Sequence, residues 1–124
     1  MSLELKDKKR TIGFSYAWNG IKHVIRTERN FRFHLMAAIL VIIAGIVFHI
    51  SHVEWSLVMI VIGLVLILEM INTAIEKLID YLKPEINPAA KIIKDISAAA
   101  VLISAITAAA IGLIIFIPKI IIIL

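Results

Sequence analysis

The sequence contains no cysteine, and it is poor in residues that interrupt helices, with three prolines and five glycines among 124 residues. The absence of cysteine excludes disulfides, thiolate nucleophiles and zinc sites built from cysteine. Two glycine-rich phosphate-binding patterns, GxxxxGK[ST] and GxGxxG, are also absent. Any nucleotide site must therefore be built without such a loop.

Apolar residues dominate instead. They make up 61% of the chain, whereas charged residues make up 18%. Soluble domains are roughly 45–50% apolar, and a soluble domain of this size could not bury so much apolar surface. We therefore expect one integral membrane domain, residues 1–124, of the all-α class.

Apolar runs divide the chain into three predicted transmembrane helices. The first span covers residues 35–50, the second 55–80 and the third 95–117, with Pro118 ending or bending the third. A helix over 55–80 would be about 39 Å long, which exceeds the ~30 Å hydrocarbon core. Its far end should therefore emerge into headgroups and water.

Positive charge predicts the orientation. Eight of the thirteen Lys and Arg residues precede residue 35, and the HISHVE connection after the first span has none. Residues 6–33 mix basic and apolar positions, which predicts an amphipathic helix region on the membrane surface. We expect a multi-pass protein of the cytoplasmic membrane with a cytoplasmic N-terminus. Nucleic acid is not expected as a partner, because a membrane surface accounts for the basic segment.

Small residues recur at every fourth position of the third span. Such a ladder allows close approach between helices, either within one subunit or between subunits. Its members are Ala100, Ser104, Ala108 and Gly112.

Four polar residues interrupt the second span at spacings of three and four, namely Glu69, Asn72, Glu76 and Asp80. At about 100° per residue they share one helical stripe roughly 60° wide. Charge at bilayer depth predicts a functional site, and an interhelical hydrogen-bond ladder is the alternative. Glu69 lies about 10 Å deeper than Glu76 by helical rise. We expect a deep general base beside a shallow acidic cluster that water and a divalent metal reach.

Three further charged residues each have two interpretations. Glu28 stands among arginines and is either a balancing acid or a second metal ligand with Glu76. Oxygen ligands without cysteine favour Mg²⁺ carried by a nucleotide. Lys94 is either an interfacial anchor or a phosphate-binding charge, and Asp95 is either a helix N-cap or part of the site.

Several of these segments together resemble the bacterial integral-membrane diacylglycerol kinase and undecaprenol kinase family, in its Gram-positive-like branch. They are EMINTAIE with Asp80, the Lys94–Asp95 pair followed by ISAAAVL, and TERNFRFH upstream, and the resemblance covers about residues 9–118. It implies a homotrimer of three-span subunits, each with a surface helix, and active sites between subunits. It also implies an ATP-dependent lipid kinase that transfers the γ-phosphoryl of MgATP to a lipid hydroxyl, with undecaprenol favoured and diacylglycerol next.

The resemblance also implies roles for individual residues. Glu69 would be the catalytic base, and Glu28 and Glu76 the metal ligands that also face the nucleotide. Asn72 and Asp80 would support the polar cluster. The other nucleotide contacts would be Lys9, Arg10, Tyr16, Glu85, Asn87, Lys94 and Asp95, with the choice between Lys9 and Arg10 left open. The lipid would contact Trp18 and Arg32 together with Glu69.

A different class of function is a non-enzymatic, oligomeric transport or channel subunit. In that hypothesis the stripe on the second span would line an ion path. A path needs polar groups across the whole membrane, but residues 55–68 are apolar apart from Ser56 and Gly63. The sequence therefore favours the lipid kinase.

Overall fold

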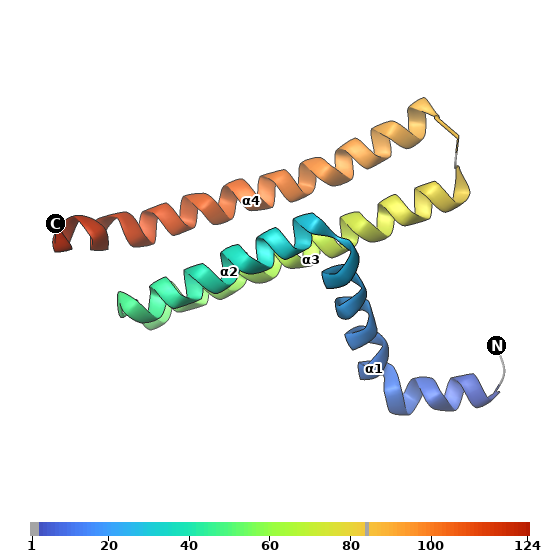
Figure 1. Cartoon of the computed structure of the whole chain (residues 1–124), viewed down its shortest axis with the longest axis horizontal. Coiled ribbons are helices and arrows are strands. Elements are labelled where there is room, and N and C mark those ends of the chain that lie inside the picture. The colour runs from blue at the N-terminus through green and yellow to red at the C-terminus, as the bar shows by residue number, and fades with distance from the viewer. Residues whose placement is uncertain (1–2, 84) are drawn as a thin grey trace.

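The computed structural model describes the backbone of residues 3–83 and 85–124, and side chains from residue 13 onward except at 84. It contains four helices, α1 (Leu3–Thr27), α2 (Arg29–Val47), α3 (His52–Leu82) and α4 (Pro88–Ile123) (Figure 1). The described residues include no strand. The predicted all-α class is confirmed.

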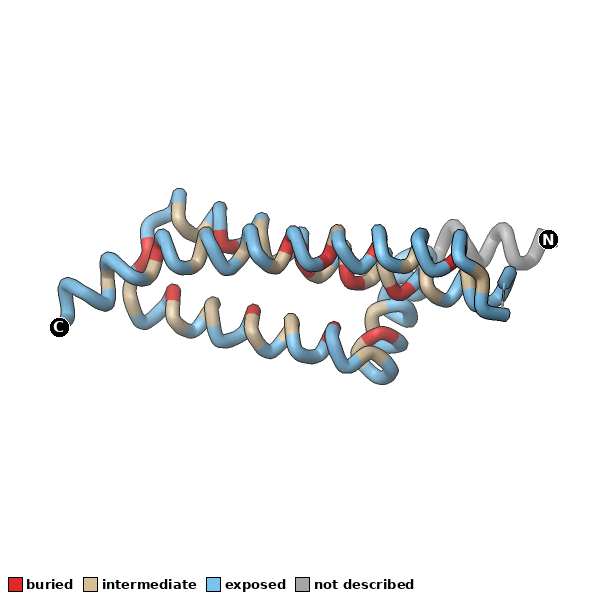
Figure 2. The backbone as a smooth tube through the Cα atoms, turned by 90° about the horizontal axis from the view of Figure 1, so that it is seen from above, coloured by how far each residue is buried: buried red, intermediate tan, exposed pale blue. Residues whose placement is uncertain are grey.

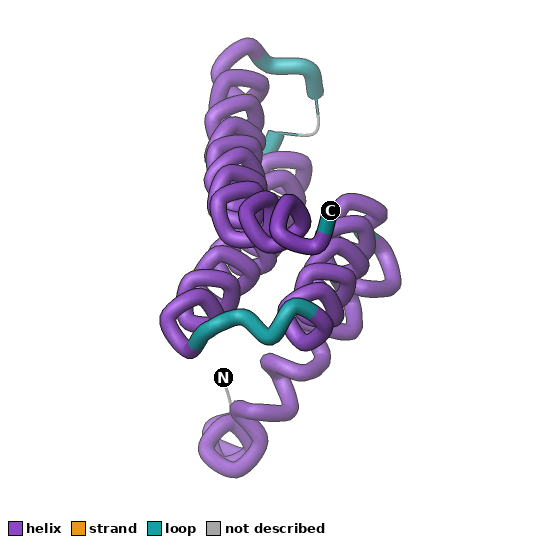
Figure 3. The backbone as a smooth tube through the Cα atoms, turned by 90° about the vertical axis from the view of Figure 1, so that its left-hand side faces the viewer, coloured by secondary structure: helices purple, strands orange, loops and turns teal. Residues whose placement is uncertain are grey.

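The three long helices α2, α3 and α4 run alongside one another, with α3 in contact with both of the others (Figures 1 and 3). Each is long and apolar enough to cross a membrane. Figure 2 shows that buried residues form narrow seams where helices face each other, while most of the helical surface is exposed. Exposed apolar surface of this extent fits a chain whose surroundings are lipid or other membrane helices.

The first helix leaves this bundle. α1 joins α2 through Glu28, whose backbone is extended, and it turns away from the long axis of α2 (Figure 1). Arg32 in the first turn of α2 donates from Nη1 to the carbonyl oxygens of Ile25 (2.9 Å) and Arg26 (3.1 Å). These carbonyls belong to the last turn of α1, where no intrahelical donor remains for them. Arg32 therefore fixes the corner between the surface helix and the first span.

The residue at which α4 begins contradicts one of the two interpretations of Asp95. Asn87 is the N-cap, because its side-chain oxygen accepts from the backbone N–H groups of Ala89 (2.9 Å) and Ala90 (3.2 Å). The N-cap interpretation of Asp95 is therefore wrong, since an Asn followed by proline at the first helical position is a stronger start signal. Pro118 lies inside α4 and does not end it.

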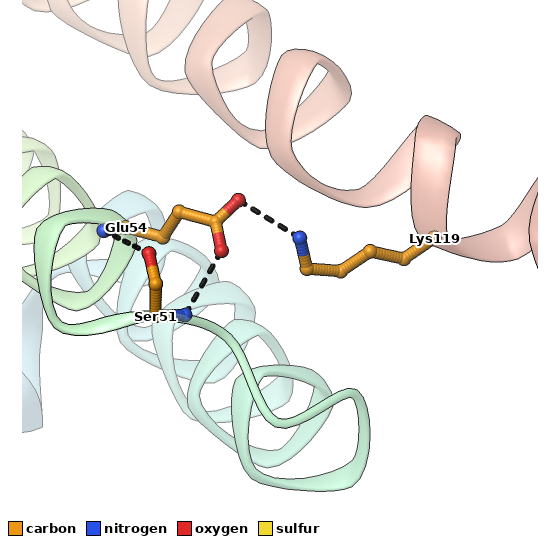
Figure 4. A network of polar contacts seen from close by, with 3 residues as sticks. All are labelled: Ser51, Glu54 and Lys119. Carbon is orange, nitrogen blue, oxygen red and sulfur yellow. Dashed lines mark hydrogen bonds and ion pairs between the residues drawn. The ribbon is translucent and has the colours of Figure 1, made fainter.

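A polar network joins α3 to α4 where α2 connects to α3 (Figure 4). The Ser51 and Glu54 side chains and backbones cap the start of α3 reciprocally, with Ser51 N to Glu54 Oε1 at 2.9 Å. Glu54 also accepts from Lys119 Nζ through Oε2 at 2.8 Å. Beside this network Trp55 packs so closely against α2 that a Cβ built on Gly45 would lie 2.7 Å from the Trp55 ring. This end of the bundle is thus tied across all three helices.

Candidate active site

The most deeply buried polar residues of α3 belong to the predicted stripe or stand beside it. Glu69 is only 4% exposed and Thr73 5%, whereas Asn72 and Glu76 are half-buried and Asp80 is exposed. The stripe therefore runs from a buried carboxylate to an exposed one, in the order that the sequence predicted. A helix brings these groups to one side because residues three and four apart share a face.

Glu69 has a partner that the sequence analysis did not assign. Nε2 of His34, on α2, lies 3.2 Å from Oε1 of Glu69. The His34 side chain is 19% exposed and the Glu69 side chain 5%. Nothing in the sequence spacing of these two residues could reveal the pair, because it forms only when the start of α2 lies beside the middle of α3.

A second pair reaches the stripe from α4. Ser97 Oγ donates to Asn72 Oδ1 at 2.6 Å, and Asn72 Nδ2 lies 3.4 Å from Glu76 Oε1. Ser97 is buried, at 8% exposure. Because the amide of Asn72 accepts from α4 with its oxygen, its nitrogen is directed toward Glu76. Ser97 was also missed by the sequence analysis, which singled out only the two residues before the run ISAAAVL.

Glu28, which the resemblance implies as a metal ligand, lies at the junction of α1 and α2. It occupies the N-cap position of α2, but its side chain does not cap the helix, and its described contact is with Thr27 Oγ1 at 3.4 Å. Glu76 lies on α3, on the same face as Glu69, whereas Glu28 lies at the junction of α1 and α2. Two carboxylates fit Mg²⁺, which usually keeps water and phosphate oxygens as its other ligands. Among the residues described, no three acidic or histidine side chains are arranged to hold a metal by themselves.

Lys94 and Asp95 point to different partners. Lys94 Nζ contacts Asp80 Oδ1, which joins α4 to the exposed end of the stripe. Asp95 accepts from Lys91 Nζ at 2.6 Å, one helical turn away. Asp80 therefore pairs with a cation of α4 at the exposed end of the stripe, and its support of the polar cluster stays a prediction.

A polar cavity of about 240 Å³ adjoins this ion pair between the end of α3 and the start of α4. It brings together three of the residues predicted to contact the nucleotide, Glu85, Asn87 and Lys94. The full lining is Ile79, Asp80, Lys83, Glu85, Ile86, Asn87, Ala90, Lys91 and Lys94. Asn87 also caps α4, so its side chain is already held in place.

The residues of α1 that were predicted to contact the nucleotide or the lipid have no described partner that supports these roles. Tyr16 and Trp18 are exposed on α1, at 46% and 54%. Lys9 and Arg10 lie outside the residues whose side chains are described. Arg32, predicted to touch the lipid, is bound to the end of α1.

A larger apolar cavity of about 550 Å³ has His34 as one of its lining residues. Residues of α2, α3 and α4 line it together, and they include Val41, Val65 and Gly112. The small-residue ladder of α4 is divided by this arrangement. Ser104 is 2% exposed, whereas a Cβ on Gly112 would meet nothing within 4 Å.

Comparison with known proteins places the chain in a family. Residues 15–116 match the prokaryotic diacylglycerol kinase family. The chain is 43% identical over 106 residues to the undecaprenol kinase of Bacillus subtilis, covering 86% of each protein. It is 37% identical over 102 residues to a diacylglycerol kinase of Synechocystis, covering 82% of this chain and 58% of that relative. A Helicobacter pylori diacylglycerol kinase is 33% identical over 88 residues, 71% of this chain and 69% of the relative. The chain therefore belongs to the prokaryotic diacylglycerol kinase family of lipid kinases.

Proposed function

We propose that this protein transfers the γ-phosphoryl group of ATP to the hydroxyl of a membrane lipid, with Glu69 as the general base. The observation that carries this proposal is the gradation of the stripe on α3. A buried carboxylate, 4% exposed, stands about 10 Å by helical rise from Glu76, which faces the polar, more exposed end. One helix thus presents a base at lipid depth and a metal ligand near water.

In the proposed reaction Glu69 removes the proton from the lipid hydroxyl. The hydroxyl oxygen bonds to the γ-phosphorus while the bond to the ADP oxygen breaks. The chain's remaining task is positioning and charge neutralisation, which dominate phosphoryl transfer. Lys94 supplies a positive point charge for phosphate. Glu28 and Glu76 would hold Mg²⁺, which neutralises phosphate oxygens when bound.

The lipid proposed first is undecaprenol, with diacylglycerol next. Support comes from the Bacillus subtilis relative, which is named an undecaprenol kinase and aligns with 86% of this chain. The apolar cavity that adjoins His34 suits any long hydrocarbon chain. We further propose that the protein lies in the cytoplasmic membrane with its N-terminus in the cytoplasm, because its basic residues gather there.

The test uses the full chain in detergent micelles with labelled ATP, Mg²⁺ and either undecaprenol or diacylglycerol. We expect label to reach lipid, faster with undecaprenol, and E69Q to lower kcat about 10²–10⁴-fold, as expected for loss of a general base. E54Q is the matched control, because Glu54 lies on the same helix away from the site. Activity of E69Q equal to that of E54Q would refute the base assignment, and absence of label in any lipid would refute the kinase.

The same preparation tests self-association. The family resemblance implies a homotrimer, so the protein mass in the micelle should be about three times 13.8 kDa. Light scattering with separate detection of detergent measures that mass. A protein mass of one subunit in an active preparation would contradict the trimer.

A further inference from the structure

The partner of the proposed base is an ionisable side chain with two different surroundings. On one side, His34 Nε2 lies 3.2 Å from Glu69 Oε1. On the other, His34 lines the apolar cavity of about 550 Å³, and it is the one titratable residue among those that line it. His34 therefore stands between the base and the space that suits a hydrocarbon chain.

The imidazole of His34 packs against one aromatic ring. The ring of Phe33 meets it edge to face, with centroids 5.6 Å apart and an interplanar angle of 80°. Among the residues whose side chains are described, His34 is the polar side chain that contacts Glu69. The contact engages Oε1 and leaves Oε2 without a described side-chain partner. A carboxylate held through one oxygen can present the other in a fixed direction.

We propose that His34 is a positioning residue for the general base. It holds Oε1 of Glu69, so that Oε2 takes the hydroxyl proton while the lipid oxygen bonds to the γ-phosphorus and the bond to the ADP oxygen breaks. This inference rests on the proposed kinase reaction.

The experiment compares kcat and KM for H34A, H34Q, H52Q and the unsubstituted chain. We expect H34A to lower kcat at least 10-fold, with KM for ATP within about two-fold, because the nucleotide-facing residues are elsewhere. H34Q keeps an N–H donor and should recover part of kcat. His52, exposed at the far end of α3, provides the control.

A kcat of H34A equal to that of H52Q would overturn the proposal, as would an H34A defect confined to KM for ATP. A spectroscopic measurement needs no His34 variant. The NMR chemical shifts of the His34 ring should change when Glu69 is replaced in E69Q, while those of His52 should stay; unchanged His34 shifts would also overturn the pairing. An active E69Q would instead refute the proposed base itself, so the two failures are distinguishable.

Discussion

Replacing Ser97 by alanine should weaken the metal site without touching any carboxylate. Ser97 Oγ is 2.6 Å from Asn72 Oδ1, and Asn72 Nδ2 is 3.4 Å from Glu76 Oε1. In S97A the amide oxygen loses its donor from α4, so nothing fixes which way the Asn72 amide faces. Glu76 would then lose the group that directs its carboxylate. The expected result is a higher Mg²⁺ concentration for half-maximal activity.

The size of this effect follows from the hydrogen bond that is removed. Hydrogen bonds between membrane helices contribute about 0.6 kcal/mol on average and up to roughly 1.7 kcal/mol. The Ser97 bond is short and buried, so a value of about 1 kcal/mol is reasonable. With 1.4 kcal/mol per factor of ten, we expect the half-saturating Mg²⁺ concentration to rise about five-fold.

A matched serine provides the control. Ser104 is also buried on α4, but its Oγ donates to the carbonyl of Val101 in its own helix at 2.6 Å. The assay is lipid phosphorylation at fixed ATP across a Mg²⁺ titration, for S97A, S104A and the unsubstituted chain. E76Q marks the effect of losing the ligand itself. Equal Mg²⁺ titrations for S97A and S104A would refute the proposed link from α4 to Glu76.

Two further predictions concern the end of the bundle where α2 connects to α3. G45A should lower the midpoint of thermal unfolding because its Cβ would lie 2.7 Å from the Trp55 ring, an overpacking cost of about 1–3 kcal/mol. G63A, where a Cβ meets nothing within 4 Å, should not lower it, and equal midpoints for the two variants would contradict the close contact. K119Q should also lower the midpoint by removing the 2.8 Å pair with Glu54, whereas K119R, which keeps the positive charge, should lower it less. Equal midpoints for K119Q and the unsubstituted chain would show that the pair does not stabilise α3 against α4.

The helices and the stripe were predictable because both depend on local spacing. An apolar run of sufficient length specifies a span, and spacings of three and four place Glu69, Asn72 and Glu76 on one face whatever surrounds the helix. The buried-to-exposed order along the stripe also follows from helical rise alone. This local geometry is why the fold class could be inferred before any coordinates, whereas the family was inferred from the resemblance of segments such as EMINTAIE.

The partners of the stripe were not predictable in the same way. Ser97 is 25 residues from Asn72, and Lys119 is 65 residues from Glu54. Such pairs depend on the rotation and offset of one helix against another, which composition and periodicity do not fix. His34 illustrates this best, since it ends the segment TERNFRFH that contributes to the family resemblance, yet nothing in that segment shows that it meets Glu69.

His34 and Ser97, whose contacts the sequence analysis missed, reach α3 from different helices. His34 comes from α2 and contacts the buried carboxylate of Glu69, whereas Ser97 comes from α4 and contacts Asn72, whose amide nitrogen donates to the more exposed carboxylate of Glu76. Glu69 and Glu76 cannot change their separation along the axis, because both are fixed to one helix about two turns apart. The direction of each carboxylate can vary. A residue of α2 influences the direction of Glu69, and a residue of α4 influences that of Glu76. The rotation of α2 against α3 should therefore govern proton removal, and that of α4 against α3 should govern metal binding.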